Sequence, residues 1–308
     1  MTDSQLIKDR FLIVIAGPTA VGKTSLSIDL AERYETEIIS ADSRQLYKEF
    51  KIGTSPPPEE ALKRVPHHFI HSHSIFNPIT AGDYEREGLA LLNRLYDRHR
   101  VVFLVGGSGL YIKALCEGLN RFPDVPDRIS KQIEEQYDRQ GIEYLKDYLR
   151  VKDPTYYEEV DLNNPRRLLR AVKVIESSGK AFSHFRQGDT GKRVFDPLYF
   201  ALNRPREILY ERINKRVDQM MQNGLLEEVK ELYPHRDLRT LQTVGYKELF
   251  KYLDGTWSLD TAVEKIKRNT RRYAKRQLTW FRNDEHYRFY QPEKDRDDIL
   301  KSIKLHVG

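Results

Sequence analysis

The sequence predicts an α/β protein with a parallel sheet flanked by helices, an all-helical insertion and a helical C-terminal part. Two apolar runs of strand length, residues 11–16 and 101–105, each lead into a glycine-rich turn and then a helical pattern. Residues 127 to about 185 show helical patterns only. Strands that alternate with helices favour a parallel sheet, and a helical stretch between them favours an insertion.

The chain is long enough for two domains or for one domain with additions. It has 308 residues, and Pro123 and Pro126 mark a change from mixed to purely helical patterns. We therefore divide it into residues 1–122, the first part of the α/β core, residues 123–195, a helical insertion domain, and residues 196–308, which complete the core and form a basic helical C-terminal region.

The composition indicates a soluble globular protein in a reducing compartment. Charged residues make up 32% and hydrophobic residues 39%, and the net charge is 52 − 46 = +6. The single Cys116 excludes an internal disulfide and a cysteine-rich zinc module. The N-terminus carries Asp3 and Asp9, and no apolar run approaches about 18 residues. Neither a signal peptide nor a membrane span is expected, so we predict a cytoplasmic protein.

Residues 17–24 read GPTAVGKT, which matches the G-x-x-x-x-G-K-T pattern of a phosphate-binding loop, or P-loop. The loop precedes a helical pattern over residues 25–33, so its backbone N–H groups converge on an anion at a helix N-terminus. Lys23 adds a point charge, and the Thr24 hydroxyl can hold Mg²⁺. We favour this interpretation over an ordinary glycine-rich turn, and we predict a P-loop NTPase-like core that binds a di- or triphosphate. The site is formed by Gly17, Pro18, Thr19, Ala20, Val21, Gly22, Lys23 and Thr24.

A second strand, residues 37–40, runs directly into Asp42. Ligands of open α/β sheets lie beyond the carboxyl ends of the strands, so Asp42 is expected on the same side as the P-loop. Residues 51–83 are rich in Pro and His and are interpreted as a long functional loop. No Cys or carboxylate lies at ligand spacing, so solvated or core histidines are favoured over a metal site at His67, His68, His71 and His73.

A helix is expected over residues 84–98, and the strand after it ends in GGSGLY, residues 106–111. This second glycine-rich turn is expected to bring further N–H groups and the Ser108 hydroxyl to the same anion. The strand lacks the terminal Asp or Glu that holds Mg²⁺ in nucleotide hydrolases. Phosphate binding is therefore supported and NTP hydrolysis is not.

In the insertion, Asn164 marks a helix start that places Arg166 and Arg170 on one face, and Gly179 marks its end. The strand signal then returns once, at residues 198–202. The chain is thus expected to fold out of the α/β core and to return to it.

Two C-terminal helices carry aligned basic residues. In residues 206–221, Arg212 and Arg216 are four apart and point the same way, as a functional pair or as ordinary surface arginines. Residues 265–282 carry eight basic residues and no acidic one. An apolar arc predicted to dock on the core contains Ile266, Tyr273, Ala274, Leu278, Trp280 and Phe281. The opposite arc, for which contact with a polyanion is favoured over simple solvation, contains Lys265, Arg268, Arg271, Arg272, Lys275, Arg276 and Arg282.

Six motifs, in order along nearly the whole chain, give a family resemblance. They are GPTAVGKT at 17–24, DSRQLY at 42–47, GGSGLY at 106–111, NPRRLLR at 164–170, TVGYKEL at 243–249 and KRQLTWFR at 275–282. With them the chain resembles the bacterial tRNA dimethylallyltransferases. The resemblance implies transfer of a dimethylallyl group from dimethylallyl diphosphate to N6 of the adenosine 3′-adjacent to the anticodon, with release of diphosphate. The family more often has Thr at Ser108, and the zinc finger of eukaryotic members is absent from this sequence with its one Cys.

This chemistry assigns roles to the motif residues. Allylic C–O cleavage builds negative charge on the leaving diphosphate, which Lys23, Ser108, Arg216 and Thr24 with Mg²⁺ are expected to clamp. Asp42 is expected to accept the proton of the attacking amine. The resemblance and the basic patterns assign contact with the anticodon stem-loop of tRNA to Asp42, Ser43, Arg44, Gln45, Arg128, Arg166, Arg167, Leu168, Leu169, Arg170, Thr243, Val244, Gly245, Tyr246, Lys247, Lys275, Arg276, Gln277, Leu278, Thr279, Trp280, Phe281 and Arg282.

Three other functions remain open. A small-molecule P-loop kinase, or an isopentenyltransferase acting on free adenine nucleotides, has no use for a basic helix on the scale of tRNA. A nucleotide-regulated RNA-binding protein is disfavoured by the missing carboxylate after residues 101–105. The expected partners are tRNA and dimethylallyl diphosphate, with no membrane contact, and the protein is expected to be a monomer.

Overall fold

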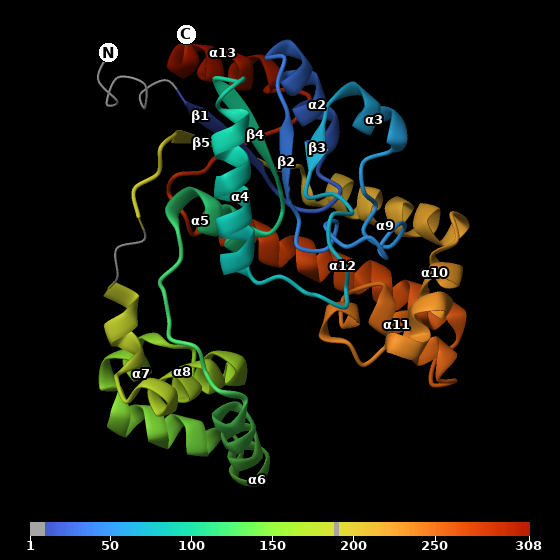
Figure 1. The fold of residues 1–308 in the computed structure, drawn as a ribbon. Coiled ribbons are helices and arrows are strands. Elements are labelled where there is room, and N and C mark those ends of the chain that lie inside the picture. The colour runs from blue at the N-terminus through green and yellow to red at the C-terminus, as the bar shows by residue number, and fades with distance from the viewer. Residues whose placement is uncertain (1–9, 188–190) are drawn as a thin grey trace. The chain divides into compact units, whose positions relative to one another are not determined.

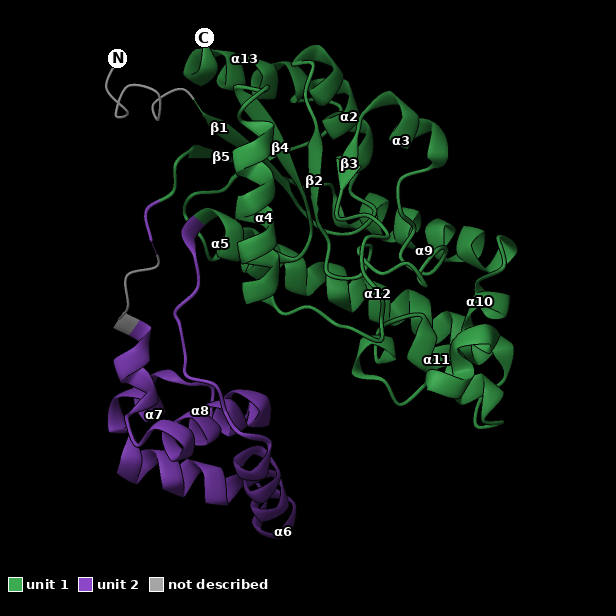
Figure 2. Ribbon diagram, viewed as in Figure 1, with its two compact units in different colours: residues 1–116, 193–308 green, residues 117–192 purple. Residues whose placement is uncertain are grey.

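The computed structural model describes residues 10–187 and 191–308 of the chain. The chain divides into two compact units: unit 1, residues 1–116 and 193–308, and unit 2, residues 117–192 (Figure 2). Asp3 and Asp9, which bear on the expectation of no signal peptide, lie outside the described residues. Within those residues, every helix is too short or too polar to cross a membrane.

Unit 1 is built on a six-stranded sheet with the strand order β3-β2-β4-β1-β5-β6, in which every neighbouring pair is parallel (Figure 1). Because side chains alternate along a strand, Leu12 and Val14 pack in one apolar cluster, and Ile13 and Ile15 pack in another. Helices therefore cover both faces of the sheet, as the apolar strands require. The strands are β1 (Phe11–Ala16), β2 (Ile38–Ala41), β3 (His67–His68), β4 (Val101–Gly106), β5 (Asp196–Leu202) and β6 (Arg288–Tyr290).

The helices of unit 1 fall into two groups. One group packs on the sheet, where α4 crosses in front of it in Figure 1. It comprises α2 (Lys23–Arg33), α3 (Glu59–Arg64), α4 (Ala81–Leu95), α5 (Gly109–Glu117) and α13 (Arg296–Val307). The other group follows β5 and comprises α9 (Arg206–Gln222), α10 (Leu225–Leu232), η3 (Tyr233–His235), η4 (Arg239–Leu241), α11 (Tyr246–Leu253) and α12 (Leu259–Arg282). In this second group α12 packs against both α9 and α11.

The register of the strands determines where the site can form. In the sheet Ala16 at the end of β1 lies opposite Gly106 of β4, and Gly106 lies opposite Ala41 at the end of β2. Three strands thus end at one level, and the segments that follow them start side by side. These segments are the P-loop, the turn that begins at Asp42, and the second glycine-rich turn at residues 106–111.

Unit 2 is entirely helical where it is described and has its own apolar core. It contains α6 (Asp127–Lys152), α7 (Pro154–Glu159), α8 (Pro165–Ser178) and η2 (Phe182–Gln187). Asn164 caps α8 by accepting from the Arg167 N–H, and Gly179 ends it with φ 69°, which confirms the predicted bounds. Gly141, with φ 73°, introduces a kink into α6.

Two predictions of local structure are wrong. Residues 51–83 are not one loop, since they contain α3 and the two-residue strand β3, which pairs with Ile38 and Ile39. The strand signal does not return only once, because the three-residue strand β6 follows α12 and pairs with β5. Strands this short show too little alternation to be recognised, and their pairing depends on a neighbouring strand that already exists.

Buried Asp153 yields a test of the packing in unit 2. Its carboxylate accepts from the Tyr156 N–H at 3.1 Å and from the N–H and hydroxyl of Ser183, each at 2.8 Å. Asp153→Ala is expected to lower the free energy of unfolding by about 2–3 kcal/mol, because buried donors lose their acceptor. Urea unfolding followed by circular dichroism measures the loss. Asp161→Ala, which removes an exposed carboxylate, is the control and is expected to change stability by less than about 0.5 kcal/mol; equal losses would contradict the assignment.

Candidate active site at the carboxyl edge of the sheet

The P-loop has the predicted strand–loop–helix order between β1 and α2. Gly17 has φ 148°, and a Cβ there would lie 2.8 Å from the Leu202 carbonyl oxygen, so the loop requires glycine at this position. Lys23 Nζ donates to the carbonyl oxygens of Gly17 at 3.0 Å and Pro18 at 2.9 Å. The first turn of α2 has no side-chain cap. Its N–H groups are therefore available to an anion.

Three charged groups interact at this edge. Burial lowers the pKa of Lys23 to about 8, the Asp42 charge opposes that shift, and the Arg216 charge adds to it. Burial also lowers the pKa of Arg216 from its usual value, again opposed by Asp42. The structure therefore brings together Lys23, Asp42 and Arg216, which come from α2, the turn after β2, and α9. Two half-buried cations share one carboxylate, so the site carries an uncompensated positive charge.

Asp42 lies at the start of a tight turn that fixes its carboxylate. Its Oδ1 accepts from the backbone N–H of Arg44 at 2.9 Å and of Gln45 at 3.3 Å. The side chains that follow are also anchored. Arg44 donates to the Thr240 carbonyl oxygen at 3.0 Å, and Gln45 Nε2 donates to the carbonyl oxygen of Thr54 at 3.2 Å. This turn thus holds a carboxylate in one orientation beside the P-loop.

The second glycine-rich turn differs from the prediction. The Ser108 N–H, expected to reach the anion, donates to the Ala41 carbonyl oxygen at 3.0 Å. The Ser108 hydroxyl contacts Ser43, accepting from its N–H at 2.9 Å and donating to its hydroxyl at 3.2 Å. A Cβ on Gly106 would lie 2.1 Å from the Ala41 oxygen. The glycine here permits close packing of the two turns, and Ser108 joins them beside Asp42.

Arg212 and Arg216 of α9 line one cavity, as their four-residue spacing predicts. Arg212 donates to the Ala20 carbonyl oxygen at 2.8 Å, and Arg216 donates to the Thr54 carbonyl oxygen at 2.9 Å. The cavity has a volume of about 680 Å³, and its lining includes the side chains of Lys51 and Lys215 as well as the two arginines. A basic cavity therefore opens beside the P-loop.

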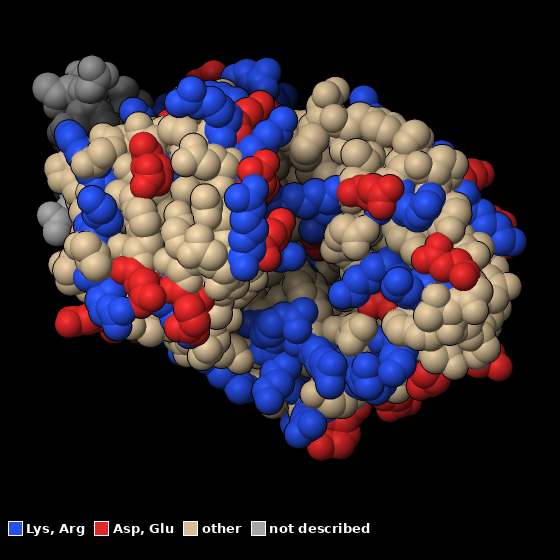
Figure 3. Space-filling model, turned by 90° about the horizontal axis from the view of Figure 1, so that it is seen from below, with Lys and Arg blue, Asp and Glu red and all other residues tan. Residues whose placement is uncertain are grey.

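Helix α12 has the predicted cationic side. Five of its basic side chains are exposed, and Lys and Arg side chains gather in a group on the face that Figure 3 shows. The exposed ones are Arg268, Arg272, Lys275, Arg276 and Arg282. Arg271 is half-buried and donates to Asn214 Oδ1 at 2.6 Å, and Lys265 lies over the Trp257 ring at 5.7 Å. The basic residues of unit 2 that were assigned to tRNA are exposed as well, namely Arg128, Arg166, Arg167 and Arg170.

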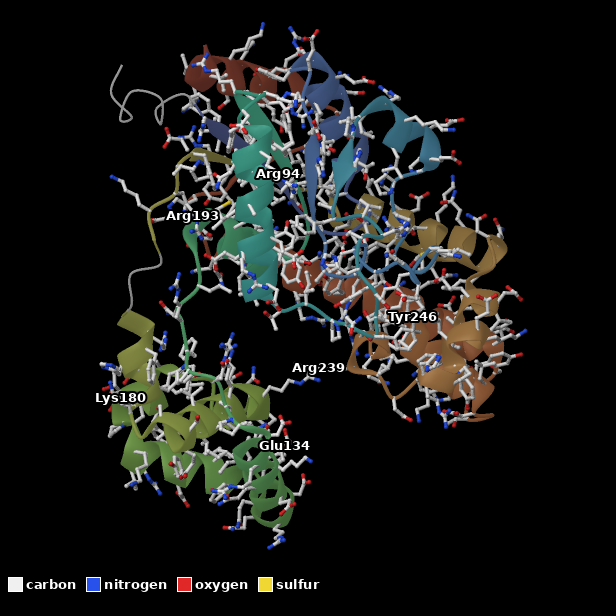
Figure 4. All side chains as sticks on the ribbon, in the orientation of Figure 1. Arg94, Glu134, Lys180, Arg193, Arg239 and Tyr246 are labelled. Carbon is white, nitrogen blue, oxygen red and sulfur yellow. The ribbon has the colours of Figure 1, made fainter. Side chains whose placement is uncertain are left out.

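Several side chains assigned to tRNA belong to the cores instead. Leu168, Tyr246 (Figure 4) and Phe281 are fully buried, so the predicted tRNA contact is wrong for these side chains. The docking face of α12 also differs, because Trp280, predicted to dock on the core, is 41% exposed. Polar Gln277 is buried in its place at 6% exposure. Hydropathy alone assigns both residues wrongly. Which side of α12 is buried depends on hydrogen bonds as well as on apolar area.

Two residues near the site were not predicted to belong to it. Glu228 of α10 is buried and accepts from the backbone N–H groups of Lys51, Ile52 and Gly53 at 2.9, 2.7 and 3.0 Å, and from the Tyr246 hydroxyl at 2.6 Å. It thereby shapes the loop whose carbonyl groups hold Arg216.

The second is Tyr273, predicted as an apolar docking residue. Burial and the Asp42 charge together raise its pKa to about 12, while the charges of Arg44 and Arg276 and a hydrogen bond with Ser108 oppose the shift. Tyr273 therefore brings α12 into contact with the centre of the site.

The four loop histidines each have a hydrogen-bond partner. His67 and His71 bond the carbonyl oxygens of Val65 and Phe50, while His68 and His73 bond the carboxylates of Glu37 and Glu87. Among the described residues, none of the four belongs to a group of three potential metal ligands. These histidines stabilise the loop and the edge of the sheet.

The fold and this site define a P-loop protein of the α/β class with a buried cationic centre and a basic C-terminal helix. A family model described as IPP transferase matches residues 45–284, and the chain belongs to this family. The chain is 48% identical over 296 residues to tRNA dimethylallyltransferase 1 of Bacteroides fragilis, covering 96% of this chain and 98% of that protein.

Solved structures also resemble this chain. The full-length tRNA isopentenylpyrophosphate transferase of Bacillus halodurans has a TM-score of 0.72 at 36% identity, covering 97% of each chain. A eukaryotic dimethylallyltransferase, described as acting on tRNA, has a TM-score of 0.81 at 27% identity, covering 96% of this chain and 78% of that chain.

The depressed pKa of Lys23 predicts a pH-dependent anion site. Pyrophosphate binding needs the charged ammonium group, so the affinity of the wild type is expected to fall as the pH rises through about 8. The loss is at most about tenfold per pH unit. Calorimetric titration with pyrophosphate at several pH values measures it. Because pyrophosphate also titrates, the Lys23→Ala variant is the reference, and a wild-type curve parallel to that of the variant would contradict the prediction.

Proposed function

We propose that this protein transfers a dimethylallyl group from dimethylallyl diphosphate to N6 of the adenosine 3′-adjacent to the anticodon of tRNA, and releases diphosphate. The observation that carries the proposal is the joining of a cationic P-loop centre with α12, whose Tyr273 reaches that centre while its opposite face is cationic. Membership of the IPP transferase family and the names of the relatives support the same reaction.

The P-loop centre is suited to a diphosphate leaving group. As the allylic C–O bond breaks, negative charge builds on the diphosphate, and fixed positive charge in a buried site stabilises it strongly. Lys23 and Arg216 supply that charge, and the N–H groups at the start of α2 supply oriented donors. The Ser108 hydroxyl completes the clamp by exchanging its bond to Ser43 for a phosphate oxygen.

The residues of the loop are compatible with Mg²⁺. The Thr24 side chain is exposed on the first turn of α2, and the Asp42 carboxylate lies close enough to Lys23 to affect its pKa. Oxygen donors of this kind, completed by phosphate oxygens and water, are what Mg²⁺ prefers. Thr24 would hold the ion, which when bound neutralises part of the diphosphate charge.

Asp42 is proposed as the general base. The N–H groups of Arg44 and Gln45 both donate to Oδ1, and within the described part of the chain Oδ2 accepts no hydrogen bond. The carboxylate is thus held in one orientation with an oxygen available to accept the proton of the adenosine amine as the new C–N bond forms. The target base must leave its stack to reach this carboxylate.

The tRNA is proposed to bind the exposed basic side chains of α12 and of unit 2, with Ser43, Arg44 and Gln45 near the target nucleotide. Residues 243–247 are proposed to contact tRNA through their exposed groups, such as Lys247. One chain is sufficient for this reaction, because the proposed site residues all come from it, and we propose that the protein acts as a monomer in the cytoplasm.

One assay tests the proposed function directly. The purified protein is incubated with labelled dimethylallyl diphosphate and either unmodified tRNA, adenosine monophosphate or no acceptor. Transfer of the label to tRNA alone is expected, and nuclease digestion followed by mass spectrometry locates the modified adenosine. Labelling of the free nucleotide, or phosphoryl transfer from ATP without any prenyl transfer, would contradict the proposal.

Asp42 gives the sharpest test of the chemical step. Asp42→Asn keeps the shape and removes the basicity, so the single-turnover rate is expected to fall about 10²- to 10⁴-fold. Binding of tRNA is expected to change little, because the Oδ1 contacts with Arg44 and Gln45 can be kept. A normal single-turnover rate combined with weaker tRNA binding would instead make Asp42 a positioning residue.

The cationic face of α12 gives a test of tRNA binding. Replacing Arg268, Arg272 and Lys275 with Gln is expected to weaken tRNA binding and to flatten the plot of log affinity against log salt by about two to three units, since each phosphate contact contributes about 0.7–0.9. Titration of fluorescent tRNA at several salt concentrations measures the slope. The triple variant of exposed Lys63, Lys301 and Lys304 makes the same charge change elsewhere, and an equal effect from it would contradict a specific role for α12.

A further inference from the structure

The buried side chain of Gln277 joins the two glycine-rich turns. The backbone N–H of Thr19 in the P-loop donates to Gln277 Oε1 at 3.0 Å. Gln277 Nε2 donates in turn to the carbonyl oxygen of Gly107, in the second turn, at 2.9 Å. One amide from α12 therefore contacts two loops that lie 258 and 170 residues away in the sequence.

The second turn is built to admit this side chain. A Cβ on Gly107 would lie 2.1 Å from Gln277 Nε2 and 3.1 Å from the Gly17 carbonyl oxygen. A Cβ on Gly109 would likewise lie 2.1 Å from Trp280 Nε1. Both glycines thus make room for α12, whose residues 273, 277 and 280 are spaced to share one face.

We infer that Gln277 is a positioning residue of the transfer reaction, whose amide sets the spacing between the P-loop and the second glycine-rich turn. This inference rests on the proposed function, in which both turns hold the leaving diphosphate. With the spacing fixed, Lys23 of the P-loop and Ser108 of the second turn can contact the same diphosphate. Without the Gln277 bridge, each turn keeps its own local structure. The P-loop and the second glycine-rich turn are then no longer spaced to bind one diphosphate together.

Glutamine is well suited to this role for a chemical reason. The bridge needs an acceptor and a donor on the two branches of one planar group, at the end of a side chain long enough to reach between the loops. Asn is one methylene shorter, ionised Glu lacks the donor, and Met offers neither strong group. The Gln277 amide is also buried. If it is removed, water cannot easily take its place as the partner of the Thr19 N–H and the Gly107 carbonyl oxygen.

The test compares Gln277→Met with a matched control on the same helix. Gln277→Met keeps the volume and removes both hydrogen bonds. Asn269→Leu removes another amide of α12, whose Nδ2 donates to Glu248 Oε1 at 2.7 Å, far along the helix from both glycine-rich turns. Pyrophosphate affinity, the single-turnover prenylation rate, tRNA affinity and the melting temperature are measured for each variant.

Gln277→Met is expected to lower pyrophosphate affinity and the single-turnover rate about 10- to 100-fold, the scale of one or two buried hydrogen bonds. Its tRNA affinity is expected to stay within about twofold of the wild type. Asn269→Leu is expected to retain pyrophosphate affinity and rate even if its melting temperature falls further. Equal losses of rate in the two variants, or a rate loss that follows the melting temperature, would overturn the inference.

A third variant separates positioning from general packing. In Gln277→Glu a protonated carboxyl group keeps one donor and one acceptor, whereas the ionised group loses the donor and repels both the Gly107 oxygen and the diphosphate. The ratio of variant to wild-type pyrophosphate affinity is therefore expected to rise as the pH is lowered from about 8 to about 5. A ratio independent of pH would overturn the inference. Failure of the wild type to prenylate tRNA would contradict the proposed function instead, while the pyrophosphate measurements still test Gln277.

Discussion

The close approach of β1, β2 and β4 at their carboxyl ends is the constraint on which the rest of the site depends. Ala16, Gly106 and Ala41 lie in register, and a Cβ on Gly106 would come within 2.1 Å of the Ala41 oxygen. Parallel pairing places the carboxyl ends of all three strands at one edge of the sheet. Gly106 lets the segments that follow these strands pack in contact. The Ser108 N–H then binds Ala41, and the Ser108 hydroxyl binds Ser43, so the turn carrying Asp42 is fixed relative to β4. The geometry of the candidate site thus follows from backbone packing.

The electrostatics of the site are incomplete in the protein alone. Burial of a cation is unfavourable unless it is paired, and Lys23 and Arg216 share the single carboxylate of Asp42. Carbonyl oxygens provide further contacts, those of Gly17 and Pro18 for Lys23 and those of Thr54 and Ser55 for Arg216. Such dipoles satisfy donors but do not neutralise charge. A polyanionic ligand would neutralise the excess positive charge of Lys23 and Arg216 and so relieve this unfavourable free energy. The site is therefore expected to prefer a diphosphate to a neutral ligand.

Local sequence patterns predicted the parts of this structure that depend on local order. The strand, glycine loop and helix of the P-loop, the helix from Asn164 to Gly179 and the cationic side of α12 are all encoded in neighbouring residues. What the sequence did not reveal depends on distant partners. Glu228 is recognisable only once residues 51–53 lie over it, and Gln277 can be buried only because Gly107 leaves space for its amide. The helical pattern of α12 alone does not show which surface the helix packs against.

Helix α12 shows how one element can serve two substrates. Its Tyr273 and Gln277 contact the site where the diphosphate is proposed to bind, whereas exposed Arg272 and Lys275 lie on the side suited to phosphates of a polynucleotide. The helix is also tied to α9 through Arg271 and Asn214, and α9 carries Arg216. A nucleic acid bound along α12 would therefore be held by the same helix that contacts the proposed leaving-group clamp. An acceptor too small to contact that face would gain nothing from it, so the architecture itself favours a large polyanionic acceptor over a free nucleotide.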